Sequence, residues 1–174
     1  DLFKSVQYQN VIEEIRQLKK RTKLLPGRFY FFLAQAHKGL RDRKKANEVL
    51  LQFIKTYPHH VKIQDAKFDV GRNLWNLGKP MAGAKYFKEV TKSTNVPKLA
   101  VKAHFFLGKI YEENKKFPEA LKSYTTALEK YPEEDYAQWA GWRLGWIHYL
   151  DGKFEKAFKK FQEAANRFPE KSFI

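Results

Sequence analysis

Apolar residues recur along this chain at the three- and four-residue spacing that places them on one face of a helix. The stretch VKAHFFLGKIYEEN (101–114) shows this spacing, and KKFPEALKSYTTALEKYPEE (115–134) shows it again. Val and Ile residues do not alternate with polar residues, as they would in a half-buried strand. The pattern therefore predicts an all-α protein.

The helical pattern also repeats. Aligning the chain with itself at an offset of 37 residues places small residues in one column, each preceded by Leu or Val. The aligned small residues are Ala34, Gly71, Gly108 and Gly145. Further columns hold Ala46, Gly83, Ala120 and Ala157, then Leu50, Phe87, Tyr124 and Phe161, and finally Pro58, Asn95, Pro132 and Pro169. Fixed-period self-similarity of this kind is typical of a solenoid.

Each repeat reads as two helices. In the third, Pro118 suits a first helical turn and Pro132 suits a helix end. Asn114, Asp151 and Gly152 stand where the turn between helices belongs. We expect a helical half-repeat or cap at 1–26, then repeats at 27–63, 64–100, 101–137 and 138–174. The predicted fold is a right-handed α-α superhelix of about four and a half hairpins, a single solenoid domain within a longer protein.

These columns resemble the tetratricopeptide repeat (TPR) at its usual internal spacing, although that repeat usually has a shorter period. The third repeat carries the match at Leu107, Gly108, Tyr111, Ala120, Tyr124, Ala127 and Pro132, and the fourth at Leu144, Gly145, Ala157, Phe161, Ala164 and Pro169. The first two repeats match less well. The resemblance covers 27–174 and implies a TPR-like solenoid that serves protein interaction.

A narrower resemblance is to the helical solenoid of bacterial soluble lytic murein transglycosylases. It rests on Trp142, Arg143, Leu144, Gly145, Trp146, Tyr149, Gly152, Ala157 and Phe161. In that family a separate lysozyme-like domain cleaves peptidoglycan. The resemblance implies a periplasmic or cell-envelope setting, with any catalytic domain outside this chain; a cytoplasmic location stays open.

Charge and composition narrow the function further. The net charge is +15, so polyanions are conceivable partners, and there is no cysteine to form a disulfide or a thiolate metal site. No apolar run is long enough to span a membrane. A basic RNA-binding helical repeat is therefore one alternative, although acidic residues beside the candidate surface disfavour nucleic acid. A stand-alone peptide-binding adaptor is another.

We find no pattern that indicates catalysis, a cofactor or a metal. The adjacent His59 and His60 lack further ligands nearby, and His37 falls in a packing column. Paired glutamates such as Glu112 and Glu113 are expected to be solvated charges on polar faces. We therefore expect this chain not to be an enzyme.

The candidate binding surface is the concave wall formed by the first helix of each repeat. One column of it is aromatic in all four repeats. We predict that the wall comprises Arg28, Phe31, Lys38, Phe68, Arg72, Trp75, Lys102, Phe105, Lys109, Trp139, Trp142, Trp146 and Tyr149. Aromatic faces suit apolar side chains or sugar rings, and the cations suit carboxylates. The expected partner is a protein or peptide segment, with peptidoglycan glycan as a second option.

Packing is the competing interpretation of these aromatics, because they also suit contacts between helices or with a neighbouring domain. The stretch WAGWRLGWIHY (139–149) poses the choice most sharply. Its small and aliphatic residues fall in packing columns, whereas Trp139, Trp142, Trp146 and Tyr149 fall on the opposite face. A helix that is apolar on both faces requires cover on both.

Overall fold

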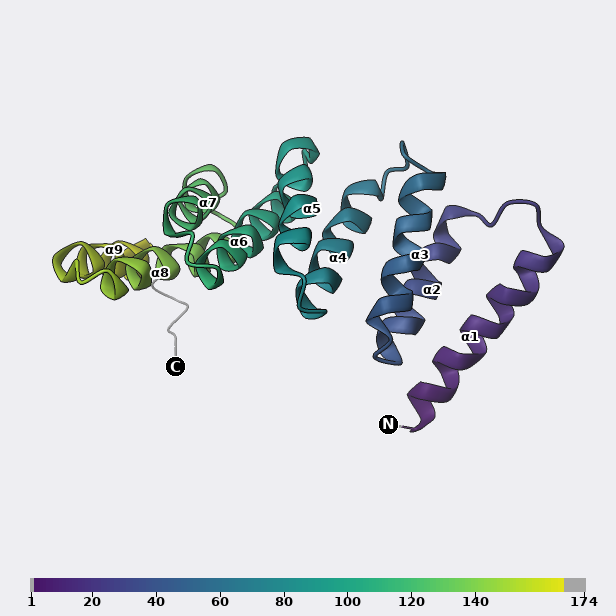
Figure 1. Ribbon diagram of the computed structural model, residues 1–174. Coiled ribbons are helices and arrows are strands. Elements are labelled where there is room, and N and C mark those ends of the chain that lie inside the picture. The colour runs from purple at the N-terminus through teal and green to yellow at the C-terminus, as the bar shows by residue number, and fades with distance from the viewer. Residues whose placement is uncertain (1, 168–174) are drawn as a thin grey trace. The chain divides into compact units, whose positions relative to one another are not determined.

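The computed structural model describes residues 2–167, and all regular structure in this part of the chain is helical. The helices are α1 (Leu2–Arg21), α2 (Gly27–Gly39), α3 (Arg43–Thr56), α4 (Ile63–Asn76), α5 (Pro80–Ser93), α6 (Pro97–Glu113), α7 (Phe117–Lys130), α8 (Asp135–Leu150) and α9 (Phe154–Arg167) (Figure 1). The predicted all-α architecture of consecutive helical hairpins is confirmed.

The helices begin and end close to the residues predicted to start and stop them. Pro118 lies in the first turn of α7, and α7 ends before Pro132. The later hairpins start slightly earlier than the predicted repeats, since α6 begins at Pro97 and α8 at Asp135. Proline has the fixed backbone angle of a first helical turn, which explains the early start of α6. Pro169, the last position of the repeat pattern, lies outside the described residues.

One residue in each turn between paired helices adopts the left-handed conformation. These residues occupy a single repeat column: Arg41 (φ 60°), Gly78 (φ 72°), Lys115 (φ 57°) and Gly152 (φ 69°). The turn geometry is thus conserved across all four repeats even where the residue is not glycine. A side chain in this region carries a steric cost that glycine avoids.

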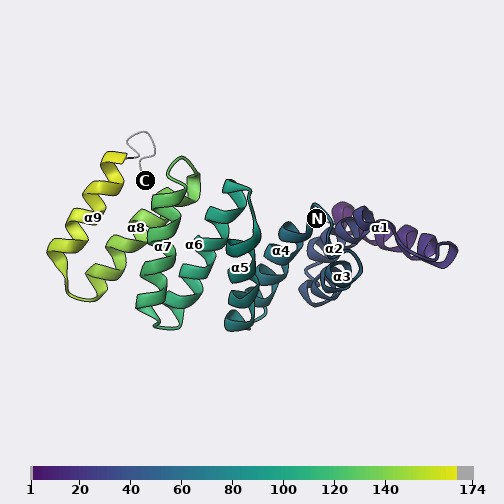
Figure 2. The same ribbon diagram turned by 90° about the horizontal axis from the view of Figure 1, so that it is seen from above.

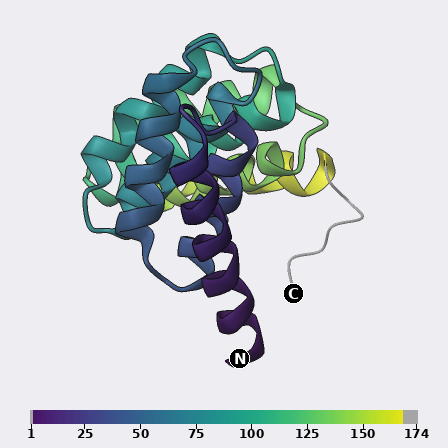
Figure 3. The same ribbon diagram turned by 90° about the vertical axis from the view of Figure 1, so that its right-hand side faces the viewer.

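Contacts divide the chain into two compact units, residues 1–86 and 87–174, with the boundary inside α5. In the N-terminal unit α1 packs on α2, α2 on α3 and α3 on α4. Figure 3 looks onto α1, the first layer of this unit. Its core includes Ile15, Leu50, Phe53 and Val70, all nearly inaccessible to solvent.

In the C-terminal unit α6 to α9 pack in sequence as antiparallel neighbours (Figure 2). The two first helices, α6 and α8, also touch each other. The core of this unit contains Tyr124, Ala127, Ala140 and Leu144. Small residues recur because the helices approach closely there.

The predicted small column shows how each hairpin closes. A Cβ added to Gly108 would lie 2.6 Å from the ring of Tyr124, and one added to Gly145 would lie 2.6 Å from the ring of Phe161. In the N-terminal unit the same two columns hold Ala34 and Leu50, both buried in the core. A large ring is therefore matched by glycine, and a smaller leucine by alanine.

Candidate functional site

The predicted binding residues divide by exposure. Arg28, Trp139, Trp146 and Tyr149 are exposed; Phe31, Lys38, Arg72, Trp75, Lys102, Phe105, Lys109 and Trp142 are partly buried; and Phe68 is buried. Each unit contributes its own part of this set, and only in the C-terminal unit do exposed aromatics gather.

The column that is aromatic in all four repeats belongs largely to hairpin packing. Phe31 lies edge-on to Phe53 at 4.9 Å between ring centroids. Phe105 lies 5.9 Å from Tyr124, and Trp142 lies 5.2 Å from Phe161. In each case the partner is on the second helix of the same hairpin. Phe68, in the same column, is only 7% exposed.

Several predicted cations are engaged by neighbours. The Lys38 Nζ lies 3.7 Å from Asp69 Oδ1, which joins α2 to α4. The Lys109 Nζ lies 3.7 Å from Glu113 Oε1. Lys102 lies over the ring of Tyr136, and Arg28 lies over the ring of Phe29, at 5.5 and 5.0 Å from the ring centroids. The basic flank of the predicted wall is thus held by local contacts.

The expectation that Glu112 is a solvated charge is wrong. Its side chain is 8% exposed and accepts hydrogen bonds from two other helices. Tyr124 on α7 donates its hydroxyl proton to Glu112 Oε2 at 2.9 Å, and Arg143 Nε on α8 donates to the same oxygen at 2.9 Å. A second guanidinium nitrogen pairs with Glu112 Oε1. A carboxylate in this position can be buried because charged and hydroxyl donors surround it.

This buried triad ties together α6, α7 and α8. Burial raises the pKa of Tyr124 above its usual value and lowers that of Arg143. The raised pKa keeps the Tyr124 hydroxyl protonated, so that it donates to the Glu112 carboxylate. The cluster therefore fixes the geometry of the hairpins, and its residue types alone gave no indication of the contact.

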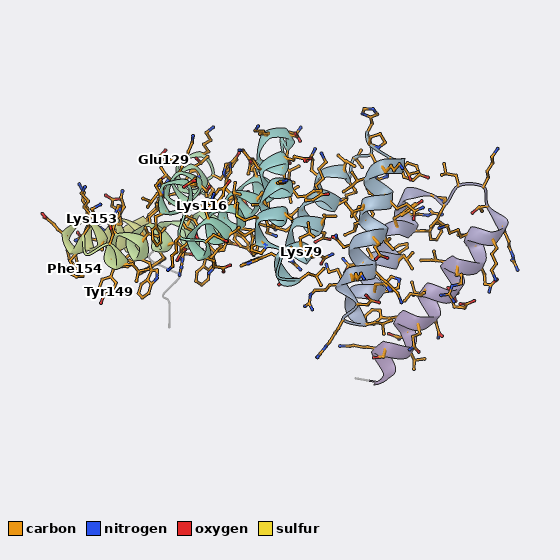
Figure 4. All side chains as sticks on the ribbon, in the orientation of Figure 1. Lys79, Lys116, Glu129, Tyr149, Lys153 and Phe154 are labelled. Atoms are coloured by element: carbon orange, nitrogen blue, oxygen red, sulfur yellow. The ribbon has the colours of Figure 1, made fainter. Side chains whose placement is uncertain are left out.

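Four exposed aromatic residues of the C-terminal unit form what we call the aromatic face: Trp139, Trp146, Tyr149 and Phe154. The first three are 48%, 41% and 49% exposed and follow one side of α8. Trp146 stacks on Tyr149 with 5.5 Å between centroids, and Tyr149 meets Phe154 edge-on at 5.5 Å. Figure 4 shows Tyr149 and Phe154 together at the turn from α8 to α9.

Phe154 was not among the predicted residues. It begins α9, in the column that holds Phe117 at the start of α7. An aromatic residue in an otherwise polar first turn was the signal that could have identified it. On the opposite side of α8, predicted to pack, Gly141, Leu144 and Gly145 are buried and His148 is partly buried.

Metal-ligating side chains are dispersed in residues 2–167. No three His, Asp or Glu side chains come together there as a metal site. Burial lowers the pKa of His104 to about 4, and it also lowers the pKa of His37 and His148. These histidines lie in packing positions. Across the described helices, none has the length and apolar character needed to cross a bilayer.

Comparison with solved structures finds similar folds at low sequence identity. MamA matches with a TM-score of 0.78 at 15% identity, over 94% of this chain and 90% of that one. MamA from Desulfovibrio magneticus RS-1 matches with a TM-score of 0.72 at 17% identity, over 98% of both chains. YrrB, described as a TPR protein with an unusual peptide-binding site, matches with a TM-score of 0.65 at 17% identity, over 83% of this chain and 70% of that one.

Comparison with curated proteins gave no match. Sequence profiles of repeat families, in contrast, match most of the chain. A profile described as tetratricopeptide repeat matches residues 68–135 and 116–172, and a second profile with the same description matches residues 31–60. Together with the paired helices and the small-to-large packing columns, these matches establish that the chain belongs to the tetratricopeptide-repeat family.

Proposed function

We propose that this protein is a non-catalytic scaffold that binds an extended segment of a partner protein on the aromatic face of the C-terminal unit. The single observation that carries the proposal is the exposure of Trp139, Trp146 and Tyr149 along one helix of a repeat fold whose role is protein interaction. Large aromatic side chains left in water on one surface mark contact sites. Trp and Tyr are also the residues that most often dominate binding energy.

The chemistry of the face favours apolar side chains as ligands. Trp146, Tyr149 and Phe154 contact one another in series, which presents ring surface with little loss of side-chain freedom on binding. Lys109, which shares a repeat column with Trp146, is paired with Glu113. We therefore expect a segment anchored by one or two large apolar residues.

Nucleic acid is a weaker candidate because basic charge and exposed aromatic groups are concentrated in different units. Residues 87–174, which hold the aromatic face, carry 16 Lys and Arg against 12 Asp and Glu, a net charge of +4. Binding of single-stranded nucleic acid combines a basic groove with stacked aromatics. Steeply salt-dependent binding of RNA by the aromatic face would contradict our proposal.

We place this scaffold in the bacterial cell envelope, as a proposal that rests on the transglycosylase resemblance of the fourth repeat and on the lack of cysteine. The comparisons add no support for that narrower resemblance. A Trp-rich surface also suits sugar rings, so glycan is a second ligand class. Sedimentation of the protein with isolated peptidoglycan, lost in Trp146→Ala, would favour glycan over peptide.

The direct test is selection of binding peptides from a random display library against the full chain. We expect the selected peptides to carry large apolar residues and to bind at least about tenfold more weakly to a Trp146→Ala/Tyr149→Ala variant. Phe32→Ala is the matched control, since Phe32 is an exposed aromatic residue of the N-terminal unit. Equal affinities of the double variant and the parent protein would overturn the proposed site.

A further inference from the structure

A pocket in the N-terminal unit has no role in the function proposed above. It lies between α1, α2 and the start of α3, with a volume of about 270 Å³. Its lining combines three apolar side chains with four nitrogen-bearing ones: Ile12, Ile15, Leu33, Arg16, Lys19, His37 and Lys45. An apolar surface bordered by cations is the chemistry of a site for an amphipathic anion.

The equivalent location in the C-terminal unit is built differently. There the pocket between α7 and α8 is about 120 Å³ and includes His148, which shares a repeat column with His37. Phe117 and Leu121 of α7 line it. In the N-terminal unit the preceding helix is α1, which does not follow the 37-residue pattern and presents Arg16 and Lys19 to its pocket. The basic pocket is thus a consequence of the irregular first helix.

The cations of this pocket are incompletely neutralised. Arg16 Nη1 lies 2.7 Å from Glu13 Oε2, and Lys45 Nζ lies 3.5 Å from Asp42 Oδ2, both within single helices. Within residues 2–167, Lys19 has no acidic partner. His37 lies in the wall, where burial lowers its pKa, so it is neutral at pH 7 and offers a hydrogen bond rather than a charge.

The surrounding charge favours the same kind of ligand. Residues 1–86 carry 18 Lys and Arg against 7 Asp and Glu, a net charge of +11. An acidic partner would be attracted to this unit before any specific contact forms. The pocket is smaller than the roughly 300–1,000 Å³ of sites for small molecules. That size suits one side chain of a larger partner.

We infer that this basic pocket binds an acidic segment of a partner protein, with one apolar side chain on Ile12, Ile15 and Leu33 and a neighbouring carboxylate at Lys19. The apolar floor favours such a segment over inorganic phosphate or the phosphates of nucleic acid, which have no group to cover it. This site is independent of the aromatic face, because all of its residues belong to the N-terminal unit.

The test uses three fluorescently labelled synthetic peptides. The first has a leucine flanked by glutamates, the second has glutamines in place of the glutamates, and the third has serine in place of the leucine. At low salt we expect the glutamate peptide to bind and Lys19→Glu to weaken it by at least about tenfold. Lys55→Glu is the matched control, because it makes the same charge change on an exposed part of α3 that does not line the pocket.

Three results would overturn the inference. Equal weakening by Lys19→Glu and Lys55→Glu would show diffuse charge attraction instead of a site. Equal binding of a peptide with serine in place of leucine would remove the apolar contact. Displacement of the peptide by inorganic phosphate at similar concentration would show a simple anion site. A Trp146→Ala/Tyr149→Ala variant should bind the glutamate peptide normally, which separates this inference from the proposed function.

Discussion

In each unit an ion pair joins the first helices of two consecutive hairpins. The two pairs occupy the same repeat columns, but their charges are reversed. Lys38 on α2 pairs with Asp69 on α4, and Glu112 on α6 pairs with Arg143 on α8. The first pair is a single contact at 3.7 Å between side chains that are 21% and 22% exposed. In the second, the acid is 8% exposed and also accepts a hydrogen bond from Tyr124.

The ion pair therefore lies at the same repeat positions in both units. The sign of the charge at each position, in contrast, differs between the units. The energetic weight of the contact then depends on burial and on additional donors. A single long contact between partly exposed side chains is worth little, whereas a buried carboxylate with several donors becomes costly to disrupt.

The largest expected effect is that of Glu112→Lys. It places an ammonium group against Arg143 and removes the acceptor of the Tyr124 hydroxyl, so we expect a loss of about 3–5 kcal/mol in the free energy of unfolding. Lys38→Glu, the corresponding reversal in the N-terminal unit, should cost about 1 kcal/mol or less. Urea unfolding followed by circular dichroism measures both.

A charge-swapped double variant sharpens this comparison. Glu112→Lys with Arg143→Asp reproduces the polarity of the N-terminal pair and should recover part of the loss caused by Glu112→Lys alone. No recovery would show that these columns of the C-terminal unit do not accept the polarity of the N-terminal pair. Equal costs for Glu112→Lys and Lys38→Glu would contradict the predicted contrast between the units.

The second prediction concerns the glycine and ring columns. Gly145→Ala forces the ring of Phe161 away from a Cβ that would lie at 2.6 Å, and should cost about 2–3 kcal/mol. Combining it with Phe161→Leu recreates the Ala34 and Leu50 pairing of the N-terminal unit. We expect the double variant to be more stable than Gly145→Ala in thermal unfolding. A double variant less stable than either single one would contradict the packing rule.

The third prediction concerns the pH dependence of the free energy of unfolding. The C-terminal unit has His104 in a repeat column where the N-terminal unit has no histidine. Above pH 6.5 His104 is neutral whether the chain is folded or unfolded. Between pH 6.5 and about 4 the unfolded chain binds a proton that the folded chain does not, because burial lowers the His104 pKa to about 4. Stability should therefore fall with falling pH, by on the order of 1–2 kcal/mol.

The control for this effect is His104→Tyr, which introduces a residue that the N-terminal unit has in this column. Tyr30 occupies the same column and lies 6.0 Å from Tyr57, as His104 lies 6.1 Å from Tyr131. His104→Tyr should flatten the fall in stability, leaving the smaller contributions of His37 and His148, whose pKa values burial also lowers. An unchanged pH profile would show that His104 is not the group responsible.

The smallest effects are expected in the turn column. Gly78→Ala places a Cβ at φ 72° and should cost about 1 kcal/mol, while Lys115→Gly relieves φ 57° and should be neutral or stabilising by less than about 1 kcal/mol. Differential scanning calorimetry can resolve the two directions. Destabilisation by Lys115→Gly of the same size as that by Gly78→Ala would exclude strain at this column.

The helices, their boundaries and the packing side of α8 could be predicted from the sequence. The reason is that small and large residues recur at the repeat period where two helices must approach closely. It placed Trp142 with Trp139 and Trp146, although Trp142 turns toward Phe161. Helical spacing gives the side of a helix but not how far a side chain at its edge turns inward. The buried Glu112 was unpredictable for a related reason: its two partners lie 12 and 31 residues away in the chain.

We propose that the two units bind by different chemistry: apolar contact on the aromatic face and charge attraction at the basic pocket. The most direct measurement is the affinity of the full chain, across a salt series, for a library-selected apolar peptide and for the glutamate-flanked leucine peptide. We predict that affinity for the first changes little with salt, that affinity for the second falls steeply, and that neither peptide displaces the other. Mutual displacement, or the same salt dependence for both, would contradict the claim.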